Sequence, residues 1–262
     1  TEMTDPDWEP VMKKASAIIT NKGGRTCHAS IVARELGIPA IVGTLNGVNI
    51  LNNDDEVTVS CCEGETGYVY KGLLDIKKTS IDMSELNNKV TNPKVMMNLA
   101  APDRAFSYAN YPNQGVGLAR EEFIINNFIQ VHPQALMKHQ ELNDEELTKT
   151  IKSLIKGYPN EREYYIQKLS YGIARIAAAS YPEDVIVRFS DFKSNEYYNL
   201  LGGNHFEPDE ENPMIGWRGA SRYYSKEFKE SFGMECEAIR RVREEMKLTN
   251  VIVMIPFCRT VE

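Results

Sequence analysis

The strongest constraint on the fold is a set of four short apolar runs in the second part of the chain, each separated from the next by residues with helical character. The apolar runs lie at residues 94–98, 115–119, 185–187 and 251–255. Helices are predicted at 102–109, 133–180 and 228–246, and the turn residues 157–160 divide the longest of these segments into two. Near-continuous apolar strands that alternate with helices are typical of a parallel sheet. We therefore predict an α/β fold for residues 93–262.

Polar residues stand at the ends of three of these predicted strands. Asn98 closes the first, Arg120 follows the second and Arg188 follows the third. The carboxyl ends of parallel strands form the ligand-binding edge both in open sheets and in barrels, so these residues alone do not separate the two architectures. A single arginine at a strand end is more often a surface ion-pair residue, and that alternative stays open for each one taken alone.

The first 75 residues have a different pattern, centred on the turn Gly23-Gly24. A strand is predicted before the turn at 17–20, and a helix after it at 30–36, with Gly37 and Pro39 as a typical helix end. A short helix is predicted at 11–15 and further strands at 40–42, 56–60 and 67–70, the last two as a hairpin. This pattern indicates a small mixed domain that precedes the sheet.

His28 lies at the start of the helix that follows the glycine turn. Free backbone N–H groups and the positive end of the helix dipole favour an anion at such a position. An imidazole there is a candidate partner for phosphate, and the alternative is a histidine that only packs beside the turn. Adjacent residues at a helix start point in different directions, which disfavours a nucleophilic pair of Cys27 and His28.

Composition narrows the class of protein. The formal net charge is −7 and no basic block is present, which argues against nucleic acid as a partner. No apolar run reaches the roughly 18 residues that a membrane span needs, and no signal-peptide pattern appears. The 5 cysteines show no C-x-x-C spacing. We therefore expect a reduced, cytoplasmic protein without structural zinc.

Residues 76–92 are polar and show no sustained period. We predict a linker here, long enough to tether a domain that moves. An ordinary surface connection would have the same composition, and the residues do not separate these alternatives.

The segment GGRTCHASIVARELGIPAIVG resembles the phosphohistidine signature of the phosphoenolpyruvate (PEP)-utilising enzymes. This resemblance implies that His28 carries a phosphoryl group between two distant sites. It also implies that residues 1–75 are a swivelling β/β/α phosphohistidine domain, whose first strands we expect to be missing from this sequence.

The segments GVGLAREEFI, VIVRFSDFKSNEY and NPMIGWRGASRY resemble three successive motifs of the PEP/pyruvate-binding barrel of the same family. The resemblance implies that residues 93–262 form the first half of a (β/α)₈ TIM barrel. By position, Arg120 and Arg188 match arginines that grip the phosphate of PEP, and Arg218 matches a third active-site arginine. A guanidinium suits this role because its fork of donors can hold phosphate oxygens in pairs.

Several other polar residues near these motifs have no assigned role. Helix capping and loop ion pairs explain Lys193, Asn195 and Glu196 as well as substrate binding does. Cys258 belongs to the active-site end by position only. The acidic stretch Glu207–Glu211 is interpreted as a solvated loop.

Within the family, the motif forms are similar to those of members that convert ATP, pyruvate and water to AMP, PEP and phosphate through a phosphohistidine. Pyruvate, phosphate dikinase, the PEP-dependent phosphotransferase and a non-catalytic phosphocarrier module are the alternatives. The resemblance implies Mg²⁺ as cofactor and ATP as phosphoryl donor. We expect the metal ligands and the ATP-binding domain to lie outside this chain, and the chain alone to be inactive. An unpaired strand edge after 251–255 predicts that the chain associates, recruits the missing half of the barrel or belongs to a larger ordered protein. We expect a homo-oligomer.

Overall fold

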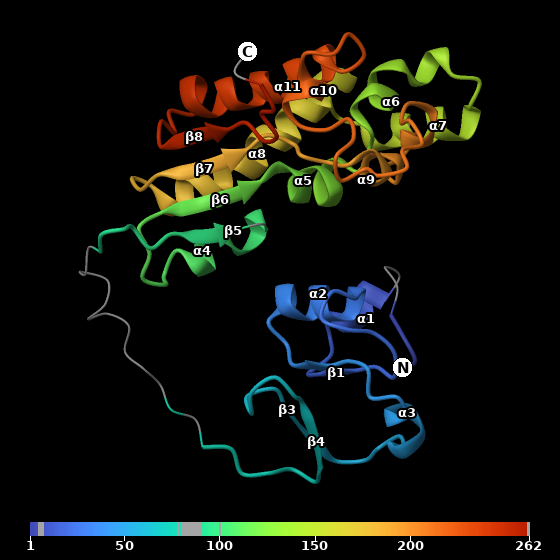
Figure 1. Ribbon diagram of the computed structural model, residues 1–262, viewed down its shortest axis with the longest axis vertical. Coiled ribbons are helices and arrows are strands. Elements are labelled where there is room, and N and C mark those ends of the chain that lie inside the picture. The colour runs from blue at the N-terminus through green and yellow to red at the C-terminus, as the bar shows by residue number, and fades with distance from the viewer. Residues whose placement is uncertain (5–7, 78, 80–90, 100, 261–262) are drawn as a thin grey trace. The chain divides into compact units, whose positions relative to one another are not determined.

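The structure is a computed structural model that describes residues 1–4, 8–77, 79, 91–99 and 101–260. The chain divides into two compact units, Thr1–Ile81 and Asp82–Glu262, which are described separately here (Figure 1). The predicted linker 76–92 lies for the most part outside the described residues.

The first unit is a small α/β domain built around two short sheets. Strand β1 (Ile18–Ile19) pairs in parallel with β2 (Ala40–Ile41), and β3 (Val57–Ser60) pairs with β4 (Tyr68–Lys71) as an antiparallel hairpin. The predicted strands and hairpin of this region are thus confirmed.

The described residues of the first unit form three short helices, α1 (Glu9–Met12), α2 (His28–Leu36) and α3 (Gly47–Ile50). Helix α2 packs against β2, and α1 packs against α2. Helix α2 ends as predicted at Gly37, whose φ of 70° is the left-handed conformation that favours glycine at this position. Ala29 and Ala33 of α2 are buried with Met12 and Ile18, so one face of this helix contributes to the core of the unit.

The second unit contains the predicted parallel sheet. Its strands are β5 (Met97–Leu99), β6 (Val116–Arg120), β7 (Val185–Arg188) and β8 (Val251–Met254). All neighbouring pairs are parallel, and the order in the sheet is the order in the chain. Parallel neighbours joined in chain order bring all four carboxyl ends to one edge of the sheet.

Helical segments connect these strands in the described part of the unit. Those longer than three residues are α4 (Ala105–Tyr108), α5 (Glu121–Ile124), the π-helical η3 (Ile125–Ile129), α6 (Pro133–Lys138), α7 (Glu145–Leu154), α8 (Glu161–Ser180), α9 (Ser194–Tyr198), α10 (Ala220–Tyr223) and α11 (Lys229–Arg240), which continues as the π-helical η6 (Arg241–Glu245).

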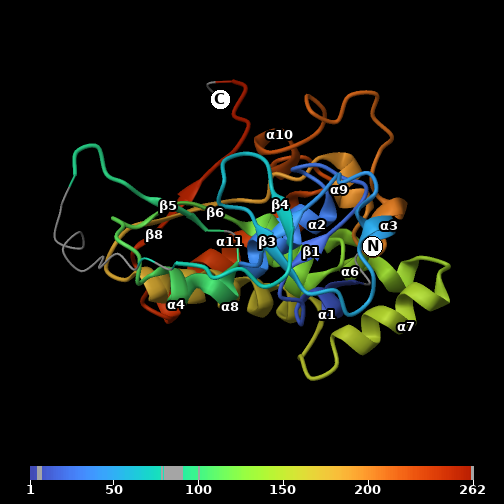
Figure 2. The same cartoon turned by 90° about the horizontal axis from the view of Figure 1, so that it is seen from below.

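The main core of this unit lies between the sheet and its longest helices. Helix α8 contacts α4, α11 and β7, and Figure 2 shows α4, α8 and α11 on one side of the strands. Val185 and Val187 of β7 are buried toward these helices. Ile186, on the opposite face, is only half-buried, and Ile252 of β8 is exposed. Among the described residues, one face of the sheet is covered at β7 and the other is open, while β8 is exposed from Ile252 onward.

Some helices differ from the prediction, and α3, α9 and α10 were not predicted. The segment 133–180 is broken not only at 157–160 but also before Asp144, whose Oδ1 accepts a hydrogen bond from Leu147 N–H (2.9 Å) and so starts α7. Asn160 starts α8 in the same way, by accepting from Glu163 N–H (2.8 Å). The helical residues 121–129 were not predicted. No helix in the described part of the chain is long and apolar enough to cross a membrane.

Candidate functional site

His28 is the first residue of α2, at the end of the helix where backbone N–H groups are free. Its Nδ1 lies 3.0 Å from Oγ1 of Thr4, a buried residue that is 6% exposed. The hydroxyl therefore fixes the plane of the imidazole and occupies Nδ1. No hydrogen bond within the described ranges engages Nε2.

Cys27 does not form a pair with His28. Its Sγ lies 3.5 Å from Oγ of Ser30, one turn along α2, and it stands at the N-cap without capping the helix through its side chain. The structure thus agrees with the expectation that the two neighbours point in different directions. Thr4 was not predicted, because its partner is 24 residues away and the contact is tertiary.

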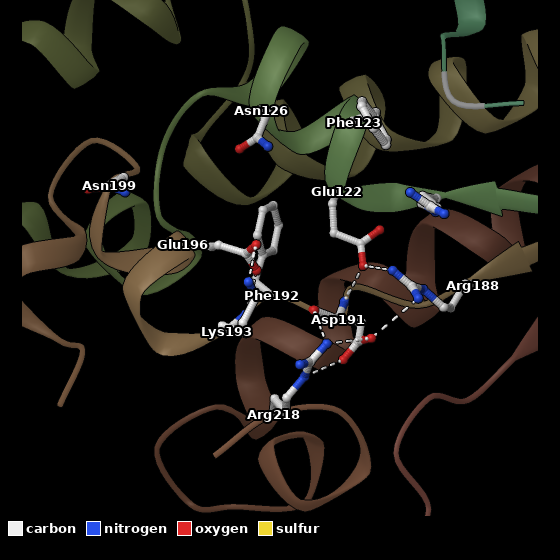
Figure 3. A pocket seen from close by; sticks show the side chains of 11 residues that line it. Glu122, Phe123, Asn126, Arg188, Asp191, Phe192, Lys193, Glu196, Asn199 and Arg218 are labelled. Atoms are coloured by element: carbon white, nitrogen blue, oxygen red, sulfur yellow. Dashed lines mark hydrogen bonds and ion pairs between the residues drawn. The ribbon is translucent and has the colours of Figure 1, made fainter. Parts of the chain in front are cut away.

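The second unit has a polar cavity of about 530 Å³ at the carboxyl ends of β6 and β7 (Figure 3). The predicted residues Arg120, Arg188 and Arg218 all line it. The other lining residues are Glu122, Phe123, Asn126, Asp191, Phe192, Lys193, Glu196 and Asn199. Arg120 and Arg188 are direct partners in the β6–β7 register, so the parallel sheet itself sets these two arginines side by side.

Asp191 is the centre of the ion-pair network in this cavity. Arg218 donates from Nε to Oδ1 of Asp191 (2.9 Å), and its Nη2 lies 2.9 Å from Oδ2. Nη1 of Arg188 reaches the same Oδ2 at 3.3 Å, and Figure 3 shows both arginines directed at this carboxylate. One buried carboxylate thus orients two guanidinium groups. The pair with Arg218 is bidentate, and bidentate pairing fixes the orientation of a guanidinium with high specificity.

Glu122 completes the network from α5. Its Oε1 accepts from Nη2 of Arg188 (2.7 Å) and from the N–H of Asp191 (2.7 Å). Burial raises the pKa of Glu122, and the neighbouring Arg188 acts in the opposite direction. The residue therefore joins the start of α5 to the loop after β7. Neither Glu122 nor Asp191 was predicted, although each lies within three residues of a predicted arginine.

Arg218 is held on its other side by the chain that follows β8. Its guanidinium carbon lies 4.2 Å from the ring centre of Phe257, a cation–π contact. The next residue, Gly219, has a φ of 60°, and a side chain there would lie 2.6 Å from the carbonyl oxygen of Pro256. Glycine is needed at this position because the two backbones approach so closely.

The charges that line the cavity leave one arginine without a carboxylate partner among the described residues. Four cations and three carboxylates line it. Lys193 pairs with Glu196 (3.0 Å), while Arg188 and Arg218 share the acidic partners described above. Arg120 is exposed, and no carboxylate of the described residues lies within ion-pair distance of it. The cavity is therefore suited to an anion that brings its own negative charge.

Other predicted residues fall outside this arrangement. Asn98 does not line the cavity, since its backbone pairs with Leu118, two residues before the end of β6. Asn195 lines a neighbouring surface pocket, and Cys258 is exposed and absent from the cavity lining. Glu196 accepts from the N–H of Lys193 (2.8 Å), which is helix capping, while both residues also line the cavity.

The interpretation of Glu207–Glu211 as a solvated loop is wrong for Glu207. Its side chain is fully buried and pairs with the guanidinium of Arg222 (2.6 Å) and with Nε2 of His132 (3.0 Å). Arg222 is itself buried against the ring of Trp217, at 3.9 Å from the ring centre. A buried guanidinium requires a counter-charge, and Glu207 provides it.

The described residues do not fit a magnesium site. Within the described ranges, no group of three or more His, Cys, Asp or Glu side chains is arranged to hold a metal ion. The three carboxylates of the cavity are each engaged by Arg188, Arg218 or Lys193. Oxygen ligands already neutralised by cations are poor ligands for Mg²⁺, so no step is assigned to a metal here.

Comparison with known proteins matches both units. Residues 1–64 match the family model described as PEP-utilising enzyme, mobile domain, and residues 76–262 match PEP-utilising enzyme, PEP-binding domain. Phosphoenolpyruvate synthase of Aquifex aeolicus is 53% identical over 307 residues, covering 100% of this chain and 36% of the relative. The synthase of Neisseria meningitidis is 58% identical (99% and 32% covered), and that of Escherichia coli is 57% identical (100% and 33%). The chain spans about a third of the length of these curated relatives.

Proposed function

The chain belongs to the family of PEP-utilising enzymes, and from this premise we propose that it carries two working parts of a phosphoenolpyruvate synthase. Residues 1–75 would be the swivelling domain with the phosphoryl-carrying His28. Residues 93–262 would bind PEP and pyruvate, and residues 76–92 would be the tether. The full reaction converts ATP, pyruvate and water to AMP, PEP and phosphate.

The contact between Thr4 and His28 carries the first half of this proposal. Oγ1 of Thr4 is within hydrogen-bond distance of Nδ1. The proposal assigns the Nδ1–H tautomer, in which this N–H donates to Oγ1 and the lone pair of the neutral imidazole lies on Nε2. Nε2 attacks the β-phosphorus of ATP, so that a P–N bond forms and the P–O bond to AMP breaks. Water then cleaves the terminal phosphate from the pyrophosphoryl group, which releases phosphate and leaves the β-phosphoryl group on Nε2. The positive charge that results on the ring is stabilised because Nδ1–H keeps its acceptor.

The three arginines carry the second half. PEP would place its phosphate against Arg120, Arg188 and Arg218, where charge is spread over three oxygens during transfer. In the synthetic direction, the enol oxygen of pyruvate attacks phosphorus while the P–N bond to His28 breaks. Nε2 is then neutral again. Lys193 would add a fourth positive charge at the same cavity.

We propose that β5–β8 are four consecutive strands of a (β/α)₈ barrel. The strand order follows the chain without reversal, which is the order of such barrels and not of doubly wound sheets. The half-buried Ile186 and exposed Ile252 lie on the face that would point inward. Further protein would cover that face and the edge of β8, either by more of the same polypeptide or by a second copy.

The remaining parts of the proposal rest on the family alone. ATP binding and the Mg²⁺ used by the family would be provided by residues other than those described here, and a cytoplasmic location is proposed for the whole enzyme. Since the chain spans about a third of its relatives, we expect it not to make PEP from ATP and pyruvate by itself.

The test uses the full-length enzyme and ATP labelled at the β-phosphate. The wild type should acquire acid-labile, base-stable label that pyruvate chases into PEP. His28→Ala should acquire none, while the control His205→Ala should behave as the wild type. Label that survives His28→Ala would overturn the proposal.

A requirement for phosphate as co-substrate would indicate a pyruvate, phosphate dikinase, and transfer to a small carrier protein would indicate a phosphotransferase. Label that is never chased to PEP would favour a phosphocarrier.

A further inference from the structure

Two buried glutamates lie directly behind the arginine cavity and have no part in the proposed reaction. Glu121 is the first residue of α5 and follows Arg120 in the chain. Glu235 belongs to α11, more than a hundred residues later. Both side chains belong to residues that are 0% exposed. Carboxyl groups are almost never buried in this way without a partner that compensates the lost hydration.

Glu235 holds the loop that carries the cavity's central carboxylate. Its Oε1 accepts from Oγ of Ser190 (2.6 Å) and its Oε2 accepts from the N–H of Ser190 (3.2 Å). Ser190 lies between Arg188 and Asp191 in the chain. Both oxygens of Glu235 therefore act as acceptors, which is the behaviour of the ionised form.

Glu121, in contrast to Glu235, has no hydrogen-bond donor beside it among the described residues. Within the described ranges, neither of its oxygens receives a hydrogen bond from a conventional donor. The β6–β7 register sets Arg120 beside Arg188, so Glu121 comes next to the loop at Ser190 that Glu235 holds. The charge of Glu235 acts on Glu121 there. Burial and the adjacent carboxylate raise the pKa of Glu121, and burial raises the pKa of Glu235. A proton on Glu121 makes it the donor that this contact needs.

The groups that face this pair do not favour two ionised carboxylates. The ionisable groups that act most strongly on the pair include Glu122 from α5, Tyr165 from α8, Tyr197 from α9, Tyr223 from α10 and Cys236 from α11. None of these groups is a cation. Burial raises the pKa of the three tyrosines, so their phenols stay neutral. Two like charges in contact in such a site share one proton.

We propose that Glu121 and Glu235 share a single proton at neutral pH, and that the resulting hydrogen bond ties the end of the strand that carries Arg120 to the end of the strand that carries Arg188. Both glutamates are positioning residues, since they act on the cavity through Arg120 and Ser190. The inference rests on the proposed function only in assigning PEP as the ligand of those arginines. Loss of the shared proton would place two negative charges in contact and would separate the two strand ends.

The shared proton is tested directly by infrared spectroscopy of the purified protein in D₂O at neutral pH. The wild type should show the carbonyl stretch of a protonated carboxyl group. Glu121→Gln, which keeps the shape and a donor but cannot ionise, should lack this band. The matched control Glu230→Gln, an exposed position on α11, should retain it. Absence of the band in the wild type, or its persistence in Glu121→Gln, would overturn the inference.

The positioning role is tested by the pH dependence of PEP binding to the full-length enzyme. The affinity of the wild type should fall about five-fold or more as the pair loses its proton, which is the scale of a modest coupling between sites. The affinity of Glu121→Gln should change by less than about two-fold over the same range. Glu230→Gln should follow the wild type.

Failure of the positioning role and failure of the proposed function give different results. A wild-type profile as flat as that of Glu121→Gln would refute the positioning role while leaving PEP binding intact. Absence of PEP binding by every protein at every pH would refute the proposed function and the positioning role together. In that case the infrared band would still decide whether the proton is shared.

Discussion

The hydroxyl of Thr4 lies 3.0 Å from Nδ1 of His28, across 24 residues of sequence, and this contact engages one of the two ring nitrogens of the histidine. Because Thr4 is buried, water does not readily replace it as the partner of Nδ1. In the proposed function, this contact orients the ring for phosphoryl transfer at Nε2.

The first prediction concerns this contact. Thr4→Val keeps the shape of the side chain and removes the hydroxyl. Nδ1 then loses its hydrogen-bond partner, and the ring loses the preference for one tautomer. We expect phosphorylation of His28 to slow by about 10- to 100-fold, the range typical of lost orienting contacts. Thr4→Ser should restore most of the rate. The measurement is the rate of label incorporation from ATP, with Thr66→Val in the exposed hairpin turn as control. An unchanged rate in Thr4→Val would show that the contact is incidental.

The second prediction concerns the geometry of the arginine cavity. Arg188→Lys keeps the charge but cannot reach Glu122 and Asp191 at the same time with a planar fork. The affinity for PEP, measured by calorimetry, should fall by about 10-fold or more. Arg240→Lys, on the exposed face of α11, should bind PEP as the wild type does. Equal affinity in both variants would mean that only net charge matters in the cavity.

The third prediction concerns the buried pair of Arg222 and Glu207. Arg222→Met leaves Glu207 buried with only His132 beside it, so an uncompensated charge remains in the core. The free energy of unfolding of the second unit, measured with urea, should fall by about 3–5 kcal/mol. The double variant Arg222→Met, Glu207→Gln should recover part of this loss, because it removes the stranded charge. If the double variant is less stable than Arg222→Met alone, the isolated charge of Glu207 is not the cause of the lost stability.

The fourth prediction is a dependence of stability on pH. The pKa of Glu121 is raised in the folded protein by burial and by the neighbouring Glu235, so the folded state binds more protons than the unfolded chain above the ordinary glutamate pKa. The stability contribution is therefore complete at or below that ordinary value, and it is lost as the pH rises through the raised pKa of the folded state. Urea unfolding of Glu121→Gln across pH should show a shallower loss of stability on the alkaline side than the wild type, and equal slopes would contradict the assignment.

Much of the sheet was predictable because its strands are short, apolar and separated by clear turns. Val185–Val187 and Val251–Met254 lie in regular β7 and β8, and the arginines that follow β6 and β7 were located from those strand ends alone. The break at 157–160 was visible from Gly157 and Asn160. The start of α7 after its N-cap Asp144 was not visible in the sequence. Apolar spacing continues across this point, and a single capping side chain marks the start of the new helix.

The partners of the predicted site residues were less accessible to sequence reasoning. Asp191 and Glu122 gave a weak signal by standing next to Arg188 and Arg120. Thr4 gave none, since nothing local distinguishes it from other threonines near a turn. Glu207 was misjudged for the same reason: its burial follows from Arg222, which lies 15 residues away and meets it only in the folded core. Contacts of this kind depend on tertiary packing and have no periodic trace in the sequence.

The most direct test of the central claim is an NMR spectrum of the phosphorylated full-length enzyme with ¹⁵N-labelled histidine, recorded under alkaline conditions that preserve the P–N bond. Coupling between phosphorus and nitrogen identifies the ring atom that carries the phosphoryl group. We predict phosphorus on Nε2 of His28, with Nδ1 protonated toward Thr4. Phosphorus on Nδ1, or on a residue other than His28, would contradict this claim.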